Sequence, residues 1–136
     1  MPRVMIVENP ERPLWSAKKM LSSINFDIAF ETGNGYEAIE KYDLVKPDFL
    51  ILDLHISKNN GLHVLKEIKK INSDAKIIIM TTFCDQTQLE ECIECGSYAV
   101  LTMPFKLKEF LALVTHKDLK YSKESVVAPV LADETL

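Results

Sequence analysis

The sequence predicts a doubly wound α/β domain, in which a parallel sheet carries helices on both faces. Five short apolar runs alternate along the chain with five segments of helical periodicity, and this alternation is typical of parallel strands joined by crossover helices. The runs are nearly continuous in apolar residues, which indicates strands that are buried on both sides. Right-handed crossovers then place the helices in layers above and below the sheet.

The first unit begins with the apolar run Val4–Val7, which ends at a carboxylate and an amide, Glu8 and Asn9. Apolar residues then recur at helical spacing, which predicts a helix with the inward positions Leu14, Ala17, Leu21 and Ile24. Pro13 fits the first turn of this helix, because its missing N–H would have no helical partner there.

The second and third units follow the same plan. A strand at 26–30 and a turn at 33–35 lead into a helix whose inward residues are Ala38, Ile39 and Tyr42. The third strand, within residues 47–53, is an apolar run that begins after Pro47 and ends abruptly at Asp53. A polar loop over 54–61 then precedes a helix with inward residues Leu62, Val64, Leu65 and Ile68.

The fourth strand is predicted at Lys76–Thr81 and is followed by a helix that begins at Asp85. The inward residues of this helix are Leu89, Cys92 and Ile93. Gly96 is a residue type that terminates helices well. A fifth strand at Tyr98–Thr102 precedes a last helix, whose apolar face carries Leu107, Phe110, Leu111 and Val114.

The periodic pattern ends near residue 117, so we predict one domain over residues 1–120 and a tail or linker over 121–136. A chain of 136 residues buries roughly two thirds of its unfolded surface as one domain. The net charge of −4 contains no block of like charge, which argues against direct binding of nucleic acid.

The N-terminus has no signal-peptide layout and no apolar stretch of membrane-spanning length, so we expect a cytoplasmic protein without membrane contact. The three cysteines are an odd number, which fits reduced thiols. Two of them form a C-x-x-C motif, Cys92 to Cys95, within a predicted helix and without a second ligand pair. We interpret them as thiols packed on a helix and not as a metal site, and the scattered histidines 55, 63 and 116 as surface residues.

Three strand ends converge at one edge of the predicted sheet. They bring together Glu8 and Asn9 from the first strand, Asp53 from the third and Thr81 from the fourth. Ligands of open α/β sheets bind at this carboxyl edge. Carboxylate and amide oxygens suit a hard cation such as Mg²⁺, and an adjacent hydroxyl suits a phosphate oxygen. The edge is therefore the candidate site.

These residues and their order resemble the receiver domain of response regulators, the phosphoacceptor module of two-component signalling, over roughly residues 3 to 117. The resemblance implies a flavodoxin-like, five-stranded parallel sheet with strand order 2-1-3-4-5. It implies that Asp53 accepts a phosphoryl group and that Thr81 donates a hydrogen bond to it. It also implies that Mg²⁺ is held by Glu8, Asn9, Asp53 and the backbone carbonyl of His55.

The chain departs from the family pattern at three positions. Glu8-Asn9 replaces the paired acids of the first strand, which lowers the expected metal affinity. Met103, within Met103-Pro104-Phe105, replaces the family lysine that pairs with the phosphoryl group, and Val100 replaces the aromatic switch. The peptide bond before Pro104 is expected to be cis, as in the family.

Two residues of the loops beside the site are possible modulators. We hypothesise that Lys58 replaces the missing lysine and that Phe83 shields a phosphorylated Asp53 from water. The acidic residues Glu90, Glu91 and Glu94 lie on the fourth helix; their simplest interpretation is a solvated face. The resemblance implies partner contacts through this helix, the fifth strand and the last helix.

Two functions remain open at the level of sequence. The first is a receiver module that takes a phosphoryl group from a sensor histidine kinase or a phosphotransfer protein and then binds an output partner or a second copy. The second is a pseudo-receiver, a protein-binding module that is never phosphorylated. We expect no enzyme activity beyond self-phosphorylation and self-dephosphorylation.

Two other classes fit less well. A phosphatase of the haloacid-dehalogenase type needs a second aspartate two residues after the first, where this chain has His55. A flavodoxin needs a phosphate-binding loop after the first strand, where this chain has Glu8-Asn9-Pro10.

Overall fold

The computed structural model describes residues 2–11, 16–56, 60–82, 85–115, 119–121 and 129–131. Its main sheet is parallel, with strand order β2-β1-β3-β4-β5, which confirms the predicted doubly wound topology. The strands are β1 (Arg3–Val7), β2 (Asp27–Thr32), β3 (Phe49–Asp53), β4 (Ile77–Thr81) and β5 (Ala99–Thr102). The helices are α1 (Ala17–Ser22), α2 (Gly35–Val45), α3 (Gly61–Ile71), α4 (Gln86–Glu94) and α5 (Leu107–Thr115).

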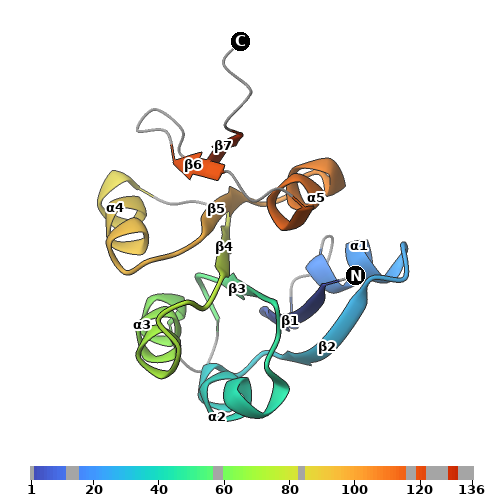
Figure 1. Cartoon of the computed structure of the whole chain (residues 1–136), viewed down its shortest axis with the longest axis horizontal. Helices are drawn as coiled ribbons and strands as arrows, with labels where there is room; N and C mark the ends of the chain where they lie inside the picture. The colour runs from blue at the N-terminus through green and yellow to red at the C-terminus, as the bar shows by residue number, and fades with distance from the viewer. Residues whose placement is uncertain are drawn as a thin grey trace.

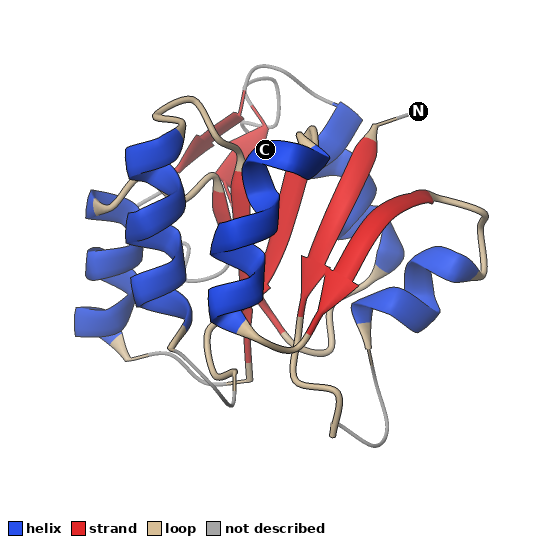
Figure 2. Cartoon of the chain, turned by 90° about the horizontal axis from the view of Figure 1, so that it is seen from below, coloured by secondary structure: helices blue, strands red, loops and turns tan. Residues whose placement is uncertain are grey.

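Two hydrophobic cores lie on opposite faces of the sheet. Helices α1 and α5 cover one face, and α2, α3 and α4 cover the other (Figures 1 and 2). Side chains of β1 and β3 alternate between the two cores, as successive residues of a strand must. The core under α1 and α5, called here the α1–α5 core, includes Ala17, Leu21, Met103, Phe105 and Phe110. The core on the other face, under α2, α3 and α4, is called the α2–α4 core. It includes Tyr42, Leu65, Leu89, Cys92 and Val100.

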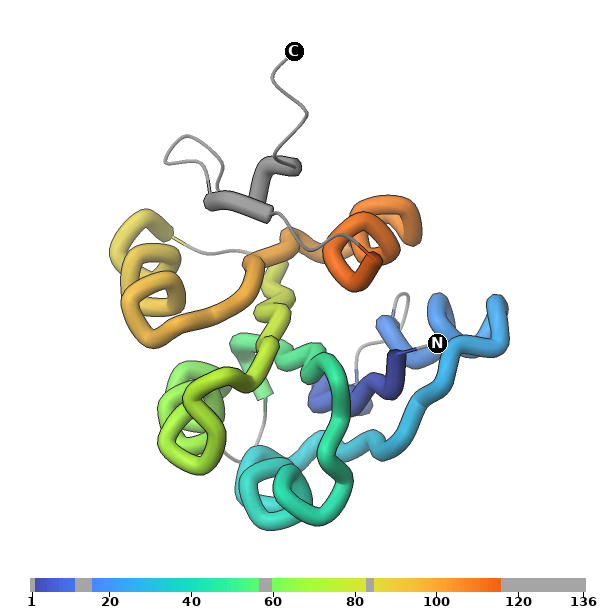
Figure 3. Tube along the Cα trace, in the orientation of Figure 1, coloured from blue at the N-terminus to red at the C-terminus, as the bar shows by residue number. Residues whose placement is uncertain are grey.

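The chain begins in the middle of the sheet and not at its edge. From β1 it passes through α1 to β2 at one edge, and then crosses back to β3 on the other side of β1 (Figure 3). The direction of winding therefore reverses between β1 and β3. Such a reversal opens a crevice at the carboxyl ends of these two strands, where ligands of this architecture bind.

Helix α1 is shorter than the periodicity predicted. It spans Ala17–Ser22, whereas the pattern extended from Leu14 to Ile24; Leu14 and Pro13 lie outside the described residues. The helix ends because Ser23 closes its last turn and Asn25 takes a left-handed conformation with φ of 55°. Six residues are too few to form a stable helix alone, so α1 depends on its packing and on its caps.

One inward position of α4 was predicted wrongly. Leu89 and Cys92 are buried, but Ile93 is 37% exposed. The buried stripe follows the spacing of three residues from Leu89 to Cys92, and Ile93 is rotated from Cys92 by one residue, about 100°. Ile93 therefore lies at the border between the core and solvent.

The chain also contains a small ribbon that the sequence pattern did not predict. β6 (Leu119–Tyr121) pairs antiparallel with β7 (Pro129–Leu131), in a sheet separate from the main one. The predicted boundary between residues 120 and 121 falls inside β6, and it stays a prediction. Among the described segments, no helix combines the length and the apolar character needed to cross a bilayer.

Candidate functional site

Asp53 is the last residue of β3, and its side chain is 0% exposed. Its carboxylate is held by backbone amides from two loops. The N–H of His55 donates to Oδ1 at 2.9 Å, and the N–H of Asn9 donates to Oδ2 at 3.4 Å. Hydrogen bonds from backbone N–H groups to a carboxylate fix the orientation of that side chain. The structure thus brings Asp53 together with two of the predicted site residues through their main chain.

A tight turn after β3 sets the position of Asp53. The N–H of Leu54 donates to the carbonyl of Met80 at 2.9 Å, and the N–H of Gly61 donates to the carbonyl of Leu54 at 2.9 Å. A Cβ on Gly61 would lie 2.6 Å from the carbonyl oxygen of Asp53 and 2.7 Å from the Cα of Leu54. Only glycine fits this close approach of two backbones, which explains the spacing from Asp53 to Gly61.

Glu8 is turned toward α1. Its Oε1 accepts the N–H of Ala17 at 3.0 Å, and its Oε2 accepts the N–H of Lys18 at 3.1 Å. The hydroxyl of Ser16 accepts the N–H of Lys19 at 3.1 Å. Glu8 and Ser16 together satisfy the first three N–H groups of α1, which have no partner inside the helix. A negative carboxylate at this end also complements the helix dipole.

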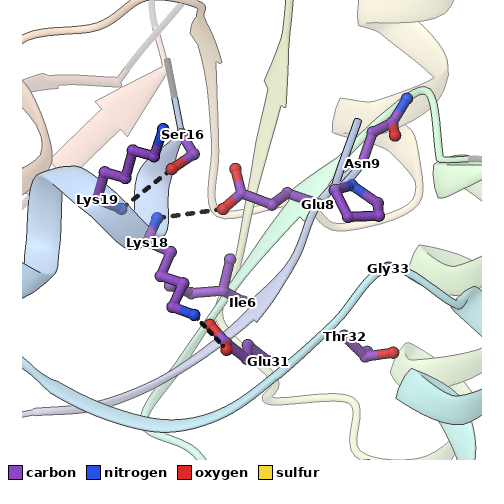
Figure 4. Close-up of a pocket in the computed structure, with 10 residues that line it drawn as sticks. Ile6, Glu8, Asn9, Ser16, Lys18, Lys19, Glu31, Thr32 and Gly33 are labelled. Atoms are coloured by element: carbon purple, nitrogen blue, oxygen red, sulfur yellow. Dashed lines mark hydrogen bonds and ion pairs between the residues drawn. The ribbon is translucent and has the colours of Figure 1, made fainter. Parts of the chain in front are cut away.

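The Asn9 side chain is engaged in its own loop. Its Oδ1 accepts the N–H of Glu11 at 3.0 Å. In Figure 4 the Glu8 side chain extends toward Lys18 and α1, while Asn9 points away on the other side of the strand end. The two side chains predicted to join Asp53 around a cation therefore point in different directions, and each has a bonded partner elsewhere.

The groups that remain around Asp53 fit a sparse magnesium site. Mg²⁺ binds through one or two carboxylates and keeps several of its waters, and Asp53 with the carbonyl of His55 can supply that minimum. Within the part of the chain that the structure describes, no three His, Cys, Asp or Glu side chains lie close enough together to hold a metal ion. Glu8, the acidic residue at the end of the adjacent strand, is turned toward α1.

Thr81 ends β4 at the same edge of the sheet. It is 1% exposed and lies opposite Thr102 of β5. Its carbonyl accepts the N–H of Met103 at 2.7 Å. Since Asp53 lies opposite Met80 in the parallel ladder, Thr81 is one residue beyond that level on the neighbouring strand, as the convergence of strand ends predicts.

Met103 and Val100 both belong to the hydrophobic cores. Met103 is 6% exposed and lies in the α1–α5 core, and Val100 is 1% exposed and lies in the α2–α4 core. Met103 offers no hydrogen-bond donor and no charge, and a valine confined by packing has no ring to turn. The peptide bond between Met103 and Pro104 is cis, as expected.

Two cavities flank the site. One, of about 270 Å³, lies between the β3–α3 loop and α4, and is lined by Leu54, His55, Asn60, Leu62, Gln88, Glu91 and Cys92. The other, of about 430 Å³, lies beside α1; its polar lining includes Glu8, Asn9, Ser16, Lys18, Lys19, Glu31 and Thr32 (Figure 4). Lys18 pairs with Glu31 at 2.7 Å, and the hydrogen bond to Glu31 raises the pKa of Lys18.

The structure describes some of the other residues singled out from the sequence and not others. Cys92 is buried and Cys95 is half-buried, both outside any disulfide, and the side chains of His55 and His63 are exposed. Lys58, Phe83 and His116 lie outside the described residues. Sequence reasoning missed the contact between Glu8 and α1. The available signal was Ser16, a residue type that favours the N-cap and marks where α1 begins.

Comparisons with known proteins give a consistent result. A family model described as "Response regulator receiver domain" matches residues 4–115. The chemotaxis protein CheY of Thermotoga maritima is 34% identical over 104 residues, which cover 76% of this chain and 87% of that protein. CheY of Bacillus subtilis is 29% identical over 112 residues, which cover 82% of this chain and 93% of that protein.

Two solved structures show the same fold. A DNA-binding response regulator of the LuxR family from Staphylococcus aureus superposes with a TM-score of 0.73 at 25% identity, covering 84% of this chain and 96% of that chain. The CheX-CheY-BeF3-Mg complex from Borrelia burgdorferi gives a TM-score of 0.72 at 22% identity, covering 82% of this chain and 85% of that chain.

Proposed function

The chain belongs to the response-regulator receiver family, and we propose that it is a signalling module that accepts a phosphoryl group on Asp53. The observation that carries this proposal is the held carboxylate at the end of β3, bonded to the backbone N–H groups of His55 and Asn9. These bonds fix the position of the Asp53 carboxylate, as a nucleophile requires. The buried environment also excludes water from a newly formed acyl phosphate.

The donor would be a phosphohistidine on a sensor histidine kinase or on a phosphotransfer protein. A carboxylate oxygen of Asp53 attacks phosphorus, the P–N bond breaks as the P–O bond forms, and the imidazole leaves and takes up a proton. Because Asp53 is 0% exposed, the groups that cover it must move aside before a donor can reach it. Water later hydrolyses the acyl phosphate to inorganic phosphate and restores Asp53, and we expect no other enzyme activity of this module.

Among the described residues of the pocket, Met103 at the family's lysine position supplies no positive charge to the product. The Thr81 hydroxyl would donate to a phosphoryl oxygen, and a Mg²⁺ ion held by Asp53 and the His55 carbonyl would neutralise charge on the transferred group. A phosphorylated aspartate adds roughly two negative charges, and Met103 cannot offset them. Lys58 remains our hypothesis for the missing cation, and Lys58→Ala tests it, since the hypothesis requires slower phosphorylation of this variant.

The output surface would be α4, β5 and α5. On α4 the exposed residues include Glu90, Glu94 and Ile93. On α5 Lys108 and Glu109 are exposed, and Lys106 is exposed directly before the helix. The acidic side chains of α4 and the lysines at the start of α5 are opposite in charge. They suit a second copy of the chain, with α4 of one facing α5 of the other, as well as a separate output partner.

A pseudo-receiver is the second candidate, and the burial of Met103 and Val100 in the two cores favours it. In that case the fold is used for protein binding alone, and partner or dimer contacts regulate it. Met103 and Val100 then only stabilise the domain, and Asp53 only holds the turn after β3 through its hydrogen bonds to His55 and Asn9.

Incubation with Mg²⁺ and acetyl phosphate, followed by intact mass spectrometry, separates the two functions. We expect one added phosphoryl group on the native chain and on Asp43→Asn, which removes an exposed aspartate of α2, and none on Asp53→Asn. No gain on the native chain, with acetyl phosphate and with several histidine kinases, would contradict phosphoryl transfer and favour the pseudo-receiver.

A further inference from the structure

We propose that Glu8 is a two-position carboxylate that couples cation binding at Asp53 to the first turn of α1. In one position it caps α1, and in the other it turns toward Asp53 as a second acidic ligand of the cation. The two positions exclude each other. The proposal rests on the proposed function only in taking the Asp53 pocket as the place where the cation binds.

The first position is the one that the structure shows. Both oxygens of Glu8 are used by α1, one by the N–H of Ala17 at 3.0 Å and the other by the N–H of Lys18 at 3.1 Å. While it holds both amides, the carboxylate is turned toward α1, on the opposite side of the strand end from Asn9 (Figure 4), so it has to turn before it can meet a cation at Asp53. Since α1 has only six residues, these two bonds are a large share of what orders its first turn.

The second position follows from how the chain connects Glu8 to Asp53. Glu8 is followed directly by Asn9, whose N–H donates to Asp53 Oδ2 at 3.4 Å. Asn9 is neutral, and its side chain is bonded to the N–H of Glu11. A divalent ion at Asp53 therefore meets one carboxylate where two would neutralise its charge, and Glu8 is the acidic side chain at the end of the adjacent strand.

Cation binding then has a structural cost at a distance from the pocket. When Glu8 turns, the N–H groups of Ala17 and Lys18 lose their acceptor, whereas that of Lys19 keeps the hydroxyl of Ser16. The change falls on the cavity beside α1, which Glu8, Lys18 and Lys19 line. A signal that begins at Asp53 would thereby reach a surface made by α1 and β2.

Amide hydrogen exchange of the ¹⁵N-labelled full chain, with and without Mg²⁺, tests this coupling. Paramagnetic broadening by Mn²⁺ of the Leu54 and His55 amides first establishes that a cation binds at Asp53. Mg²⁺ should then accelerate exchange of the Ala17 and Lys18 amides by roughly fivefold to tenfold, the effect expected for loss of a helix cap. The Lys19 amide should change less, because Ser16 still caps it.

Two variants serve as matched controls. Glu8→Gln keeps an acceptor for α1 but has no charge to offer a cation, so Mg²⁺ should no longer accelerate exchange at Ala17 and Lys18. Ser16→Ala removes the other cap of the same helix, so the Lys19 amide should exchange faster both with and without Mg²⁺. In this variant Mg²⁺ should still accelerate exchange of the Ala17 and Lys18 amides.

The outcomes separate this coupling from phosphoryl transfer. Broadening at Leu54 and His55 with unchanged exchange at Ala17 and Lys18 would overturn the coupling, and so would the absence of broadening at millimolar Mn²⁺. Accelerated exchange in a chain that gains no phosphoryl group would support the coupling and contradict the proposed function. A phosphoryl group gained without any change of amide exchange in α1 would support the proposed function and contradict the coupling.

Discussion

The two sides of the Asp53 pocket are held in different ways. On the β1 side, the family's two acidic positions are occupied by polar residues, Glu8 and Asn9. Both side chains are fixed by hydrogen bonds, Glu8 to the N–H groups at the start of α1 and Asn9 to the N–H of Glu11. On the β5 side, the residues at the family's lysine and aromatic positions are Met103 and Val100, and both are fixed by packing in a core.

This difference indicates which side can move. A hydrogen bond at a helix end contributes about 1 kcal/mol to stability and can be exchanged for another partner. A well-packed core side chain contributes several times more, and its neighbours close around it. A change of charge at Asp53 is therefore expected to rearrange the β1 side and to leave the β5 side as it is.

The largest effect is expected for Met103→Ala. Truncation of a buried methionine costs about 2–5 kcal/mol, and Met103 is 6% exposed in the α1–α5 core. Chemical denaturation measures the free energy of unfolding, and Met103→Leu, which conserves volume, should cost less than about 1.5 kcal/mol. A loss below about 1 kcal/mol in the alanine variant would mean that Met103 is not fixed by packing.

A smaller loss is expected for Val100→Phe, which places a ring where the family has its aromatic switch. Overpacking of a filled core costs about 1–3 kcal/mol, because Val100 is 1% exposed and surrounded by the α2–α4 core. The measurement is again the free energy of unfolding. A neutral or stabilising effect would show that the β5 side has room for a moving ring, and the contrast between the two sides would fail.

Glu8→Ala is expected to cost about 0.5–2 kcal/mol, since it removes the acceptor of two N–H groups at the start of α1. Ser16→Ala, which removes the acceptor of one, should cost less on the same scale. Thermal unfolding followed by circular dichroism compares the two variants. Equal stability of Glu8→Ala and the native chain would mean that Glu8 does not order α1.

The smallest effect is expected for Lys18→Met, which removes an exposed ion pair with Glu31. Exposed pairs contribute little to stability, so the unfolding midpoint at neutral pH should stay unchanged. The pKa of Lys18 is raised by its hydrogen bond to Glu31. Whatever the pair contributes is therefore present below the ordinary lysine pKa and is lost as the pH rises through the raised value. A lower unfolding midpoint of Lys18→Met at neutral pH would mean that the Lys18–Glu31 pair, and not Glu8, holds α1 in place.

Patterns of local periodicity predicted most of the fold. Apolar runs located β1, β3, β4 and β5, and an alternating pattern located β2. The strand ends placed Asp53, Asn9 and Thr81 at one edge. The helix before β2 was predicted too long, because its apolar spacing continues past the residues that the backbone keeps helical. The β6–β7 ribbon was missed, since three-residue strands are too short to show a period.

The direction of individual side chains could not be predicted from spacing. Both Glu8 and Asn9 lie at the expected strand end. The orientation of their side chains, however, depends on which backbone N–H groups come close to them in the folded chain. The N–H groups of α1 attract Glu8, and the N–H of Glu11 attracts Asn9. The burial of Met103 in the α1–α5 core was not predicted, although methionine is a side chain that packs well in a core.

One measurement tests the contrast between the two sides most directly. Mg²⁺ and beryllofluoride, a mimic of the phosphoryl group, are added to the labelled chain, and resonances on the two sides are compared. The amides of Ala17 and Lys18 should shift as Glu8 leaves α1, while the methyl resonances of Val100 keep their positions. Shifted Val100 methyls together with unchanged Ala17 and Lys18 amides would contradict the account.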